Sequence, residues 1–203
     1  MSLPKLLAAL AIAASALAAS QAACARALVI YYSSLGPAKN ADAHPSQDMG
    51  HTQFVAYVIK DEVEANIYRL ETASPYQAGS LAELRAIARH EHNDNARPEI
   101  KNPLPDLSSY NTVYIGNPVW WHDYPMVFYT MFETSDFSGK TLVSFNTNEG
   151  SGPSTMVKIL RKAAPGATVL PECLAITGTT AAQSADEIRA WLRDRKLSQK
   201  QDQ

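Results

Sequence analysis

The stretch Ala27-Leu28-Val29-Ile30-Tyr31-Tyr32 decides the fold class of this chain. It is a continuous apolar run, as expected for a β-strand that is covered on both faces. Similar runs recur at residues 112–115, 141–145 and 174–176, and the shorter, more polar run at 67–70 is typical of an edge strand. The sequence therefore predicts five strands.

Amphipathic stretches separate these strands. Apolar residues recur at helical spacing at residues 52–62, 81–92 and 126–132, around Leu160 and around Trp191. In the second of these helices, Leu81, Leu84 and Ile87 form the expected buried face. Ser184 and Glu187 form a capping-box pattern that predicts the start of the last helix. Strands that alternate with helices indicate an α/β fold, a doubly wound parallel sheet with helices on both faces.

The N-terminal residues have the pattern of a secretory signal. Lys5 is followed by an apolar run at 6–19 and by small residues up to Ala23. The run is shorter than the roughly 20 residues that span a membrane, so we expect no membrane span after the signal is removed. Removing 23 of the 203 residues leaves 180, which suits one domain at 24–203. We expect a periplasmic or secreted protein.

Charge and cysteine content exclude other classes. The net charge of −2 becomes −3 when Lys5 is removed with the signal, which argues against a nucleic-acid partner. Two cysteines are too few for a disulfide scaffold. Cys24 and Cys173 could pair after export, Cys24 could carry a lipid anchor, or both could be incidental.

In an open parallel sheet, ligands bind at the carboxyl ends of the strands, so the residues after each strand are the candidates for a site. Ser33 and Ser34 follow the first strand, and Gly50-His51-Thr52 opens the next helix after a polar stretch. Hydroxyls and free N–H groups at a helix N-terminus favour an anion, phosphate above all. The alternative is an ordinary turn in which Thr52 caps the helix.

The loop after the third strand carries two adjacent tryptophans. It reads Gly116-Asn117-Pro118-Val119-Trp120-Trp121-His122. The tryptophans could form a stacking surface for a flat aromatic ligand, or one could pack under a helix while the other covers the loop. We favour the stacking surface.

The loop after the fourth strand is rich in glycine and hydroxyl groups. It includes Thr147, Asn148, Glu149, Gly150, Ser151 and Gly152. Its glycines allow the backbone to approach a ligand, whereas Ser151 and Pro153 could instead cap and open the next helix. Together, the three loops hold Gly36, Gly50, Gly116, Gly150 and Gly152, five of the nine glycines in the chain.

These motifs resemble the flavodoxin family, in particular a branch with a paired-tryptophan loop. The resemblance rests on residues 95–101, 114–121, 136–140 and 165–167 and extends over nearly all of the chain after about Ala27. It implies a flavodoxin-like, five-stranded fold that binds FMN non-covalently for electron transfer or flavin-dependent reduction.

The resemblance also assigns residues to the FMN site. Ser33, Ser34, Gly50, His51 and Thr52 would hold the phosphate; Pro118, Val119, Trp120, Trp121 and His122 would flank the ring; Thr147, Asn148, Glu149, Gly150, Ser151 and Gly152 would line its other edge and the ribityl chain.

The chain departs from the family pattern at three points. Residues 35–49 split the phosphate loop, so that Gly36 or Gly50 could be its turn glycine. Asn148-Glu149 replaces His-Gly. If Glu149 points at the flavin, its carboxylate would repel a reduced, anionic ring and so lower the reduction potential of that step. His122 replaces a small residue and is either a proton donor or a loop side chain.

The sequence fits several functions. An electron carrier and a reductase that uses NAD(P)H or a quinone both fit, each with an unidentified redox partner or small-molecule acceptor. A binding module without cofactor is the alternative, and a hydrolase that pairs Ser33 or Ser34 with His51 or His122 is a weaker one. His90-Glu91-His92 predicts no metal site, because histidines two apart lie on different helix faces.

Overall fold

The computed structural model describes residues 27–34 and 49–198. The predicted signal at 1–23, Cys24, Gly36 and all of the 35–49 insert except Met49 lie outside the described residues. No helix within the described ranges is long and apolar enough to cross a membrane.

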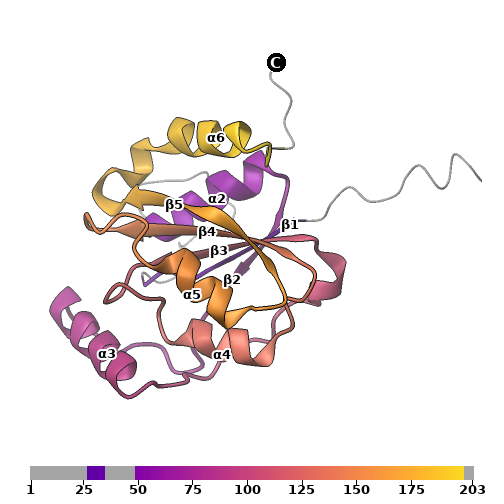
Figure 1. The fold of residues 1–203 in the computed structure, drawn as a ribbon. Coiled ribbons are helices and arrows are strands. Elements are labelled where there is room, and N and C mark those ends of the chain that lie inside the picture. The colour runs from indigo at the N-terminus through magenta and orange to yellow at the C-terminus, as the bar shows by residue number, and fades with distance from the viewer. Residues whose placement is uncertain (1–26, 35–48, 199–203) are drawn as a thin grey trace, which may run out of the picture.

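The centre of the molecule is a five-stranded parallel sheet with the order β2-β1-β3-β4-β5 (Figure 1). Its strands are β1 (Ala27–Tyr31), β2 (Asn66–Arg69), β3 (Thr112–Pro118), β4 (Thr141–Asn148) and β5 (Thr168–Thr177). The order places β2 at one edge, as its polar sequence predicts. It also reverses direction between β1 and β3, which is the switch point of a doubly wound sheet. The predicted α/β class is confirmed.

Helices cover both faces of this sheet. The helices of the described ranges are α2 (His51–Glu62), α3 (Leu81–Asn93), α4 (Val127–Thr134), α5 (Met156–Ala163) and α6 (Ala185–Asp194), with short 3-10 turns at η1 (Leu107–Ser109) and η2 (Gly178–Gln183). α2 and α6 lie over one face, and α4 and α5 lie over the other (Figure 1). Side chains of β1 alternate accordingly: Val29 packs in one core with Phe54, and Ile30 in the other with Phe128.

The strands β3 and β4 extend further than the sequence predicts. Gly116, Asn117 and Pro118 lie in β3, and residues 146–148 lie in β4, although the sequence places both segments in loops. The parallel ladder continues to pair them, for example Pro118 with Thr147. Polar residues can end these strands because their side chains find partners inside the protein, as Asn146 does with the thiol of Cys173 at 3.4 Å.

Helix α6 begins directly after Ser184, as predicted, but the predicted capping box does not form there. Ser184 occupies the N-cap position of α6, but its hydroxyl donates backwards to the carbonyl oxygen of Thr180 at 2.9 Å. A related arrangement occurs at α3, whose N-cap is Ser80. There the Ser80 hydroxyl accepts from the Glu83 N–H at 3.2 Å, and the Glu83 carboxylate accepts at 2.7 Å from the N–H of Gly79, the residue before the N-cap.

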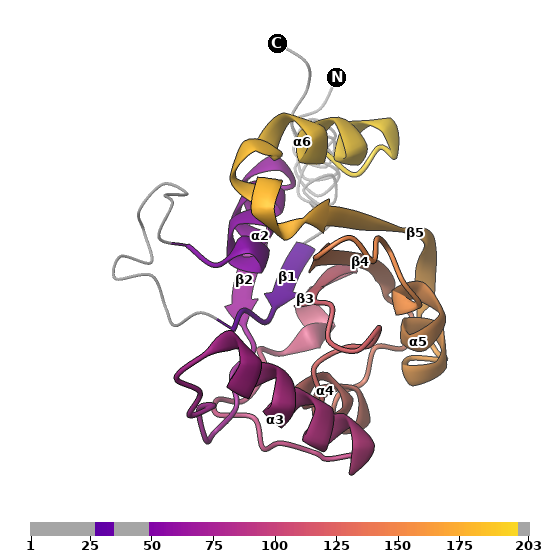
Figure 2. The same ribbon diagram turned by 90° about the vertical axis from the view of Figure 1, so that its left-hand side faces the viewer.

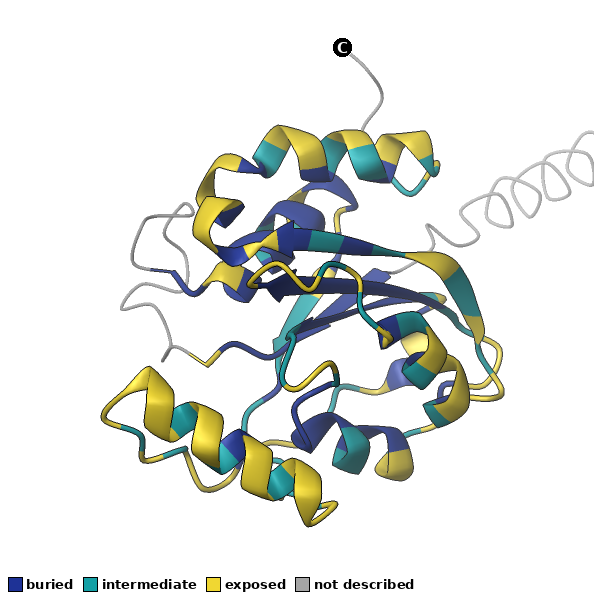
Figure 3. Cartoon of the chain, turned by 60° about the vertical axis from the view of Figure 1, so that its left-hand side comes forward, coloured by how far each residue is buried: buried dark blue, intermediate teal, exposed yellow. Residues whose placement is uncertain are grey.

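Helix α3 stands apart from the sheet. It lies beyond the carboxyl ends of β1 and β2 (Figure 2), and its surface is mostly exposed (Figure 3). Ala88 is its one buried residue, and the side chain of Leu81 is 59% exposed. The prediction that Leu81, Leu84 and Ile87 form a buried face against the core is therefore wrong. Leu81 and Leu84 instead line a cavity between α3 and the sheet.

Candidate ligand site

A cavity of about 650 Å³ lies at the carboxyl edge of the sheet, next to the switch point between β1 and β3. Four segments surround it: the end of β1 with the start of α2, the turn after β3, the loop after β4, and α3. Its lining residues are Ser33, Ser34, Gly50, His51, Thr52, Leu81, Leu84, Arg85, Ala88, Pro118, Val119, Trp120, Trp121, His122, Thr147, Asn148, Glu149, Ser151 and Gly178.

One end of the cavity is formed by the N-terminus of α2. Its N-cap is Gly50, which has no side chain to cap the helix, and its first turn contains no acidic residue. The first backbone N–H groups therefore have no intrahelical acceptor and favour an anion. Thr52 is not the cap; its hydroxyl pairs with that of Thr147 at 2.7 Å. One hydroxyl proton is used in this bond, so the other stays available for a ligand.

Gly178 also lines this end of the cavity, where its backbone packs against the ring of His51. A Cβ at Gly178 would lie 2.5 Å from the His51 Nδ1, so the imidazole packs directly on the backbone that follows β5. Sequence reasoning missed this residue, although a signal exists. Gly178 directly follows the fifth strand, where the carboxyl-end rule applies as it does to the other strands.

The turn after β3 is a tight hairpin turn. Trp120 and Asp123 exchange two backbone hydrogen bonds of 3.0 and 2.9 Å. The two residues between them, Trp121 and His122, have φ angles of 53° and 63°. This is the geometry of a type I′ turn, which non-glycine residues adopt only at a cost of about 1–3 kcal/mol each. The His122 carbonyl is held by the hydroxyl of Thr155 at 2.8 Å, so the strained turn is anchored to the start of α5.

Trp120 packs into an aromatic cluster. Its ring centroid lies 5.5 Å from that of Tyr32 and 5.7 Å from that of Tyr76. The Tyr76 hydroxyl donates to a carboxylate oxygen of Glu91 at 2.8 Å, which ties the cluster to α3. Burial, followed by the hydrogen bond to this carboxylate, raises the pKa of Tyr76, so the hydroxyl stays protonated and keeps donating.

Trp121 makes a different set of contacts. Its side chain is 43% exposed, and its indole N–H donates to the Arg85 carbonyl at 3.3 Å. The guanidinium of Arg89 lies 4.3 Å from its ring centroid, within cation–π range. Trp121 therefore links the turn to α3 across the mouth of the cavity. The structure divides the tryptophan pair into one packing residue and one surface residue.

The loop after β4 turns its glycines away from the cavity. The N–H groups of Gly150 and Gly152 both donate to Asn148 Oδ1, at 2.9 and 3.0 Å. Their φ angles of 100° and 61° favour glycine, most strongly at Gly150, since other residues rarely adopt an angle near 100°. Glu149 and Ser151 line the cavity, and Gly150 and Gly152 do not.

Two sequence-based alternatives at other loop positions are also corrected. The N-cap of α5 is Thr155, so Ser151 does not cap this helix and Pro153 precedes its first turn. Gly116 does not lie in a ligand loop. It lies within β3, where a Cβ would overlap the ring of Phe145 on the neighbouring strand.

The comparison with known sequences identifies the family. Residues 27–195 match the sequence model of a family described as Flavodoxin. The chain belongs to the flavodoxin family. None of the curated protein sequences compared with this flavodoxin-family chain matches it.

Solved structures agree with this assignment. A candidate flavoprotein from Bacteroides eggerthii is 27% identical, with a TM-score of 0.66, and the match covers 83% of this chain and 96% of that one. A candidate flavoprotein from Bacteroides uniformis is 26% identical, with a TM-score of 0.67 and coverages of 83% and 98%. A flavoprotein from Lactobacillus acidophilus, solved in complex with FMN, is 19% identical with a TM-score of 0.58 and coverages of 79% and 98%, so it supports the fold alone.

The structure brings together most of the residues that the sequence selects as cofactor-binding, and all except Gly150 and Gly152 line the cavity. Sequence reasoning missed the wall formed by α3, with Leu81, Leu84, Arg85 and Ala88. The amphipathic stripe of α3 predicts a helix but gives no sign that the helix leaves the sheet, because that placement depends on distant contacts.

The residue pairs of the proposed hydrolase do not form a hydrogen-bonded unit. Within the described ranges, neither Ser33 nor Ser34 is hydrogen-bonded to His51 or His122. The His122 Nδ1 lies instead 3.4 Å from the hydroxyl of Ser154. A serine nucleophile needs a base within hydrogen-bond reach, so this site lacks that arrangement.

The three residues of the His90-Glu91-His92 segment contact different partners. His90 pairs with Asp94 at 3.2 Å, and His92 pairs with Asp123 of the tryptophan turn at 3.4 Å. Glu91 accepts the hydrogen bond from Tyr76. No group of metal-ligating side chains is found among the residues that the structure places.

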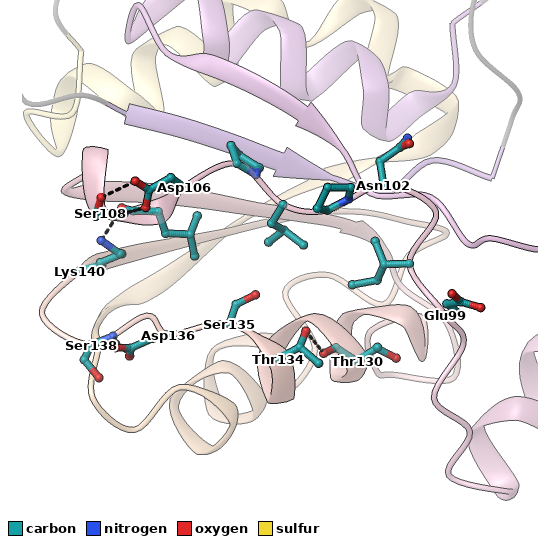
Figure 4. Close-up of a pocket in the computed structure, with 15 residues that line it drawn as sticks. Glu99, Asn102, Asp106, Ser108, Thr130, Thr134, Ser135, Asp136, Ser138 and Lys140 are labelled. Atoms are coloured by element: carbon teal, nitrogen blue, oxygen red, sulfur yellow. Dashed lines mark hydrogen bonds between the residues drawn. The ribbon is translucent and has the colours of Figure 1, made fainter.

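A second cavity, of about 850 Å³, lies at the opposite, amino edge of β3 and β4 (Figure 4). Its charged groups serve the local backbone. Lys140 donates to the carbonyls of Leu107 and Tyr110 at 2.6 and 2.9 Å. Asp106 accepts from both the hydroxyl and the N–H of Ser108, which lowers the pKa of its carboxyl group. These groups hold turns together, so the cavity at the carboxyl edge is the better ligand site.

Proposed function

We propose that this protein is a flavoprotein that holds FMN in the cavity between α3 and the carboxyl edge of the sheet. Its function is electron transfer or flavin-dependent reduction. One observation carries the proposal: the two ends of the cavity differ chemically as the two ends of FMN do. The α2 end suits an anion, and the end formed by α3 and the tryptophan turn suits a flat aromatic ring.

The phosphate would bind at the α2 end. The N–H groups of the first turn of α2, whose N-cap is Gly50, can donate to its oxygens, as can the nearby hydroxyls of Ser33 and Ser34. The free hydroxyl proton of the Thr52–Thr147 pair adds another donor. His51 would add positive charge to this end when it is protonated.

The isoalloxazine ring would bind at the other end. Leu81, Leu84 and Ala88 of α3 form one apolar wall, and Val119 with the two tryptophans forms the other, so a flat aromatic group is sheltered from water. When bound, FMN supplies the electron-accepting chemistry, and the protein supplies position and electrostatics.

Two exposed charged residues on the cavity wall bear on the reduced cofactor. Glu149 and Arg85 both line the cavity. A carboxylate disfavours an anionic reduced ring, and a guanidinium favours it. We propose that the balance between these two charges tunes the reduction potential.

The family and a relative of the same fold support the proposal. The chain belongs to the flavodoxin family, and the Lactobacillus acidophilus flavoprotein of similar fold binds FMN. Family membership supports a flavin cofactor, whereas the FMN complex is a property of the Lactobacillus acidophilus protein, which shares the fold. The assignment of residues of this chain to FMN rests on the cavity geometry.

Purified protein should bind FMN with a dissociation constant in the micromolar range or tighter, because the cavity offers both a phosphate site and a ring site. Titration should quench the fluorescence of FMN, since the indoles of Trp120 and Trp121 lie at the ring end. Riboflavin, which lacks the phosphate, is the matched control ligand and should bind at least tenfold more weakly.

The same titration distinguishes the alternatives. Protein that is colourless and does not bind FMN at micromolar concentrations would contradict the proposal and favour a binding module without cofactor. If FMN binds, steady-state oxidation of NAD(P)H with a quinone acceptor separates a reductase, which turns over, from an electron carrier, which does not.

We also propose that the protein is exported. The proposal rests on the signal pattern at residues 1–23, which lie outside the described residues. Expression of the full chain in a bacterial host should give a periplasmic protein whose mass lacks 23 residues. A further mass increase at Cys24 would identify a lipid anchor. Protein that keeps its leader and stays in the cytoplasm would contradict export.

A further inference from the structure

The buried side chain of Asn148, at the end of β4, has no hydrogen-bonding capacity left for a ligand. Its Nδ2 donates to Asn146 Oδ1 at 3.1 Å and to the Ile176 carbonyl at 3.2 Å. Its Oδ1 accepts from the N–H groups of Gly150 and Gly152. An asparagine amide has two donors and two acceptor positions, so all four are used.

These bonds also determine which way the amide faces. If it were turned over, the NH₂ group would point at the two glycine N–H groups, and the oxygen would point at Asn146 Oδ1 and the Ile176 carbonyl. All four contacts would then be between like groups. Asn146 in turn donates to the Cys173 thiol at 3.4 Å, and Cys173 lies 3.4 Å from the Ser144 hydroxyl. The orientation of Asn148 is therefore set from within the sheet.

As a result, alternate residues of the loop at 149–152 play different parts. Asn148 binds alternate residues, Gly150 and Gly152, and the intervening residues, Glu149 and Ser151, line the cavity. Without an acceptor at Asn148 Oδ1, the two glycines lose the contact that holds their φ angles of 100° and 61°.

We propose that Asn148 is a positioning residue. It presents Glu149 and Ser151 to the ligand by binding the N–H groups of Gly150 and Gly152, and it does not bind the cofactor itself. This inference rests on the proposed binding of FMN at the same cavity. A loop held in one conformation binds more tightly than one that must be ordered on binding.

The first test uses the protein without FMN, so that it does not depend on the proposed function. Amide hydrogen exchange, measured by NMR, should be at least tenfold faster at Gly150 and Gly152 in Asn148→Ala than in the unchanged protein. Asn148→Asp keeps an acceptor for the two amides but sets a second oxygen against Asn146 Oδ1 and the Ile176 carbonyl, so both amides should exchange more slowly than in Asn148→Ala and faster than in the unchanged protein. Equal exchange at both amides in the unchanged protein and in Asn148→Ala would overturn the proposal.

The second test measures FMN affinity by fluorescence quenching. Asn148→Ala should weaken FMN binding by about tenfold, whereas Thr130→Ala should leave it unchanged. Thr130 is the control, because its half-buried hydroxyl also makes a hydrogen bond, to the Pro98 carbonyl at 2.8 Å, but it lies on α4 at the other cavity and outside the contacts that orient Asn148. Urea unfolding of both variants separates loss of affinity from loss of stability.

The outcomes distinguish the two proposals. If the unchanged protein does not bind FMN, the proposed function fails, and the exchange result still decides the role of Asn148 in the loop. If the unchanged protein binds FMN and Asn148→Ala binds it equally well, the positioning role fails and the proposed function stands.

Discussion

Replacing Trp121 with alanine is expected to weaken FMN binding by about 30-fold while lowering the free energy of unfolding by about 1 kcal/mol or less. Aromatic stacking on a flat ring is worth about 1–3 kcal/mol, and about 2 kcal/mol corresponds to this change in affinity. The effect on stability is small because the side chain is 43% exposed and an exposed cation–π contact contributes little. Fluorescence titration and urea unfolding measure the two quantities.

Trp191→Ala is the matched control. Trp191 lies on α6, and the guanidinium of Arg195 lies 4.3 Å from its ring centroid, the same distance as from Arg89 to Trp121. Its loss should leave FMN affinity unchanged. Trp121→Phe keeps a ring but loses the hydrogen bond to the Arg85 carbonyl, so it separates stacking from the link to α3. Equal FMN affinity in Trp121→Ala and the unchanged protein would show that Trp121 does not contact the ring.

The second large effect is on stability. Gly116→Ala should lower the free energy of unfolding by about 3 kcal/mol, because the added Cβ would overlap the ring of Phe145. Phe145 is fully buried in the core between the sheet and α2, so its ring has little room to move. Urea unfolding measures the change.

Gly79→Ala tests whether the loss is specific to this contact. A Cβ at Gly79 would meet Glu83 Oε2 at 3.5 Å, an ordinary contact distance, so little change is expected. In a Phe145→Ala background, Gly116→Ala should cost less than about 1 kcal/mol, because the clashing ring is gone. A full loss in that background would show that the overlap is not the cause.

Much of the fold could be predicted because the decisive signals are local. Residues 27–32 are apolar on both sides of the strand, and this pattern requires a sheet covered on both faces. The predictions failed where polar side chains end a strand. Asn146 and Asn148 resemble loop residues in sequence, but their partners come from β5 and from the following loop, which no local pattern shows.

The candidate site was predictable in position and less so in detail. Residues that follow parallel strands meet at one edge, so Ser33, Trp120 and Thr147 could be placed near one another from the sequence. The separate roles of Trp120 and Trp121 could not, because they depend on the left-handed φ angle at Trp121 and on the position of α3.

The sequence by itself determined the order of strands and helices along the chain and the edge of the sheet at which a ligand would bind. Both follow from hydrophobic periodicity and from the geometry of parallel strands, which are properties of neighbouring residues. Only the tertiary structure decided that α3 forms a cavity wall, that Gly116 serves packing, and that Asn148 faces the loop. Each of these depends on contacts between residues on different elements, and the direction of a side chain is set by such contacts.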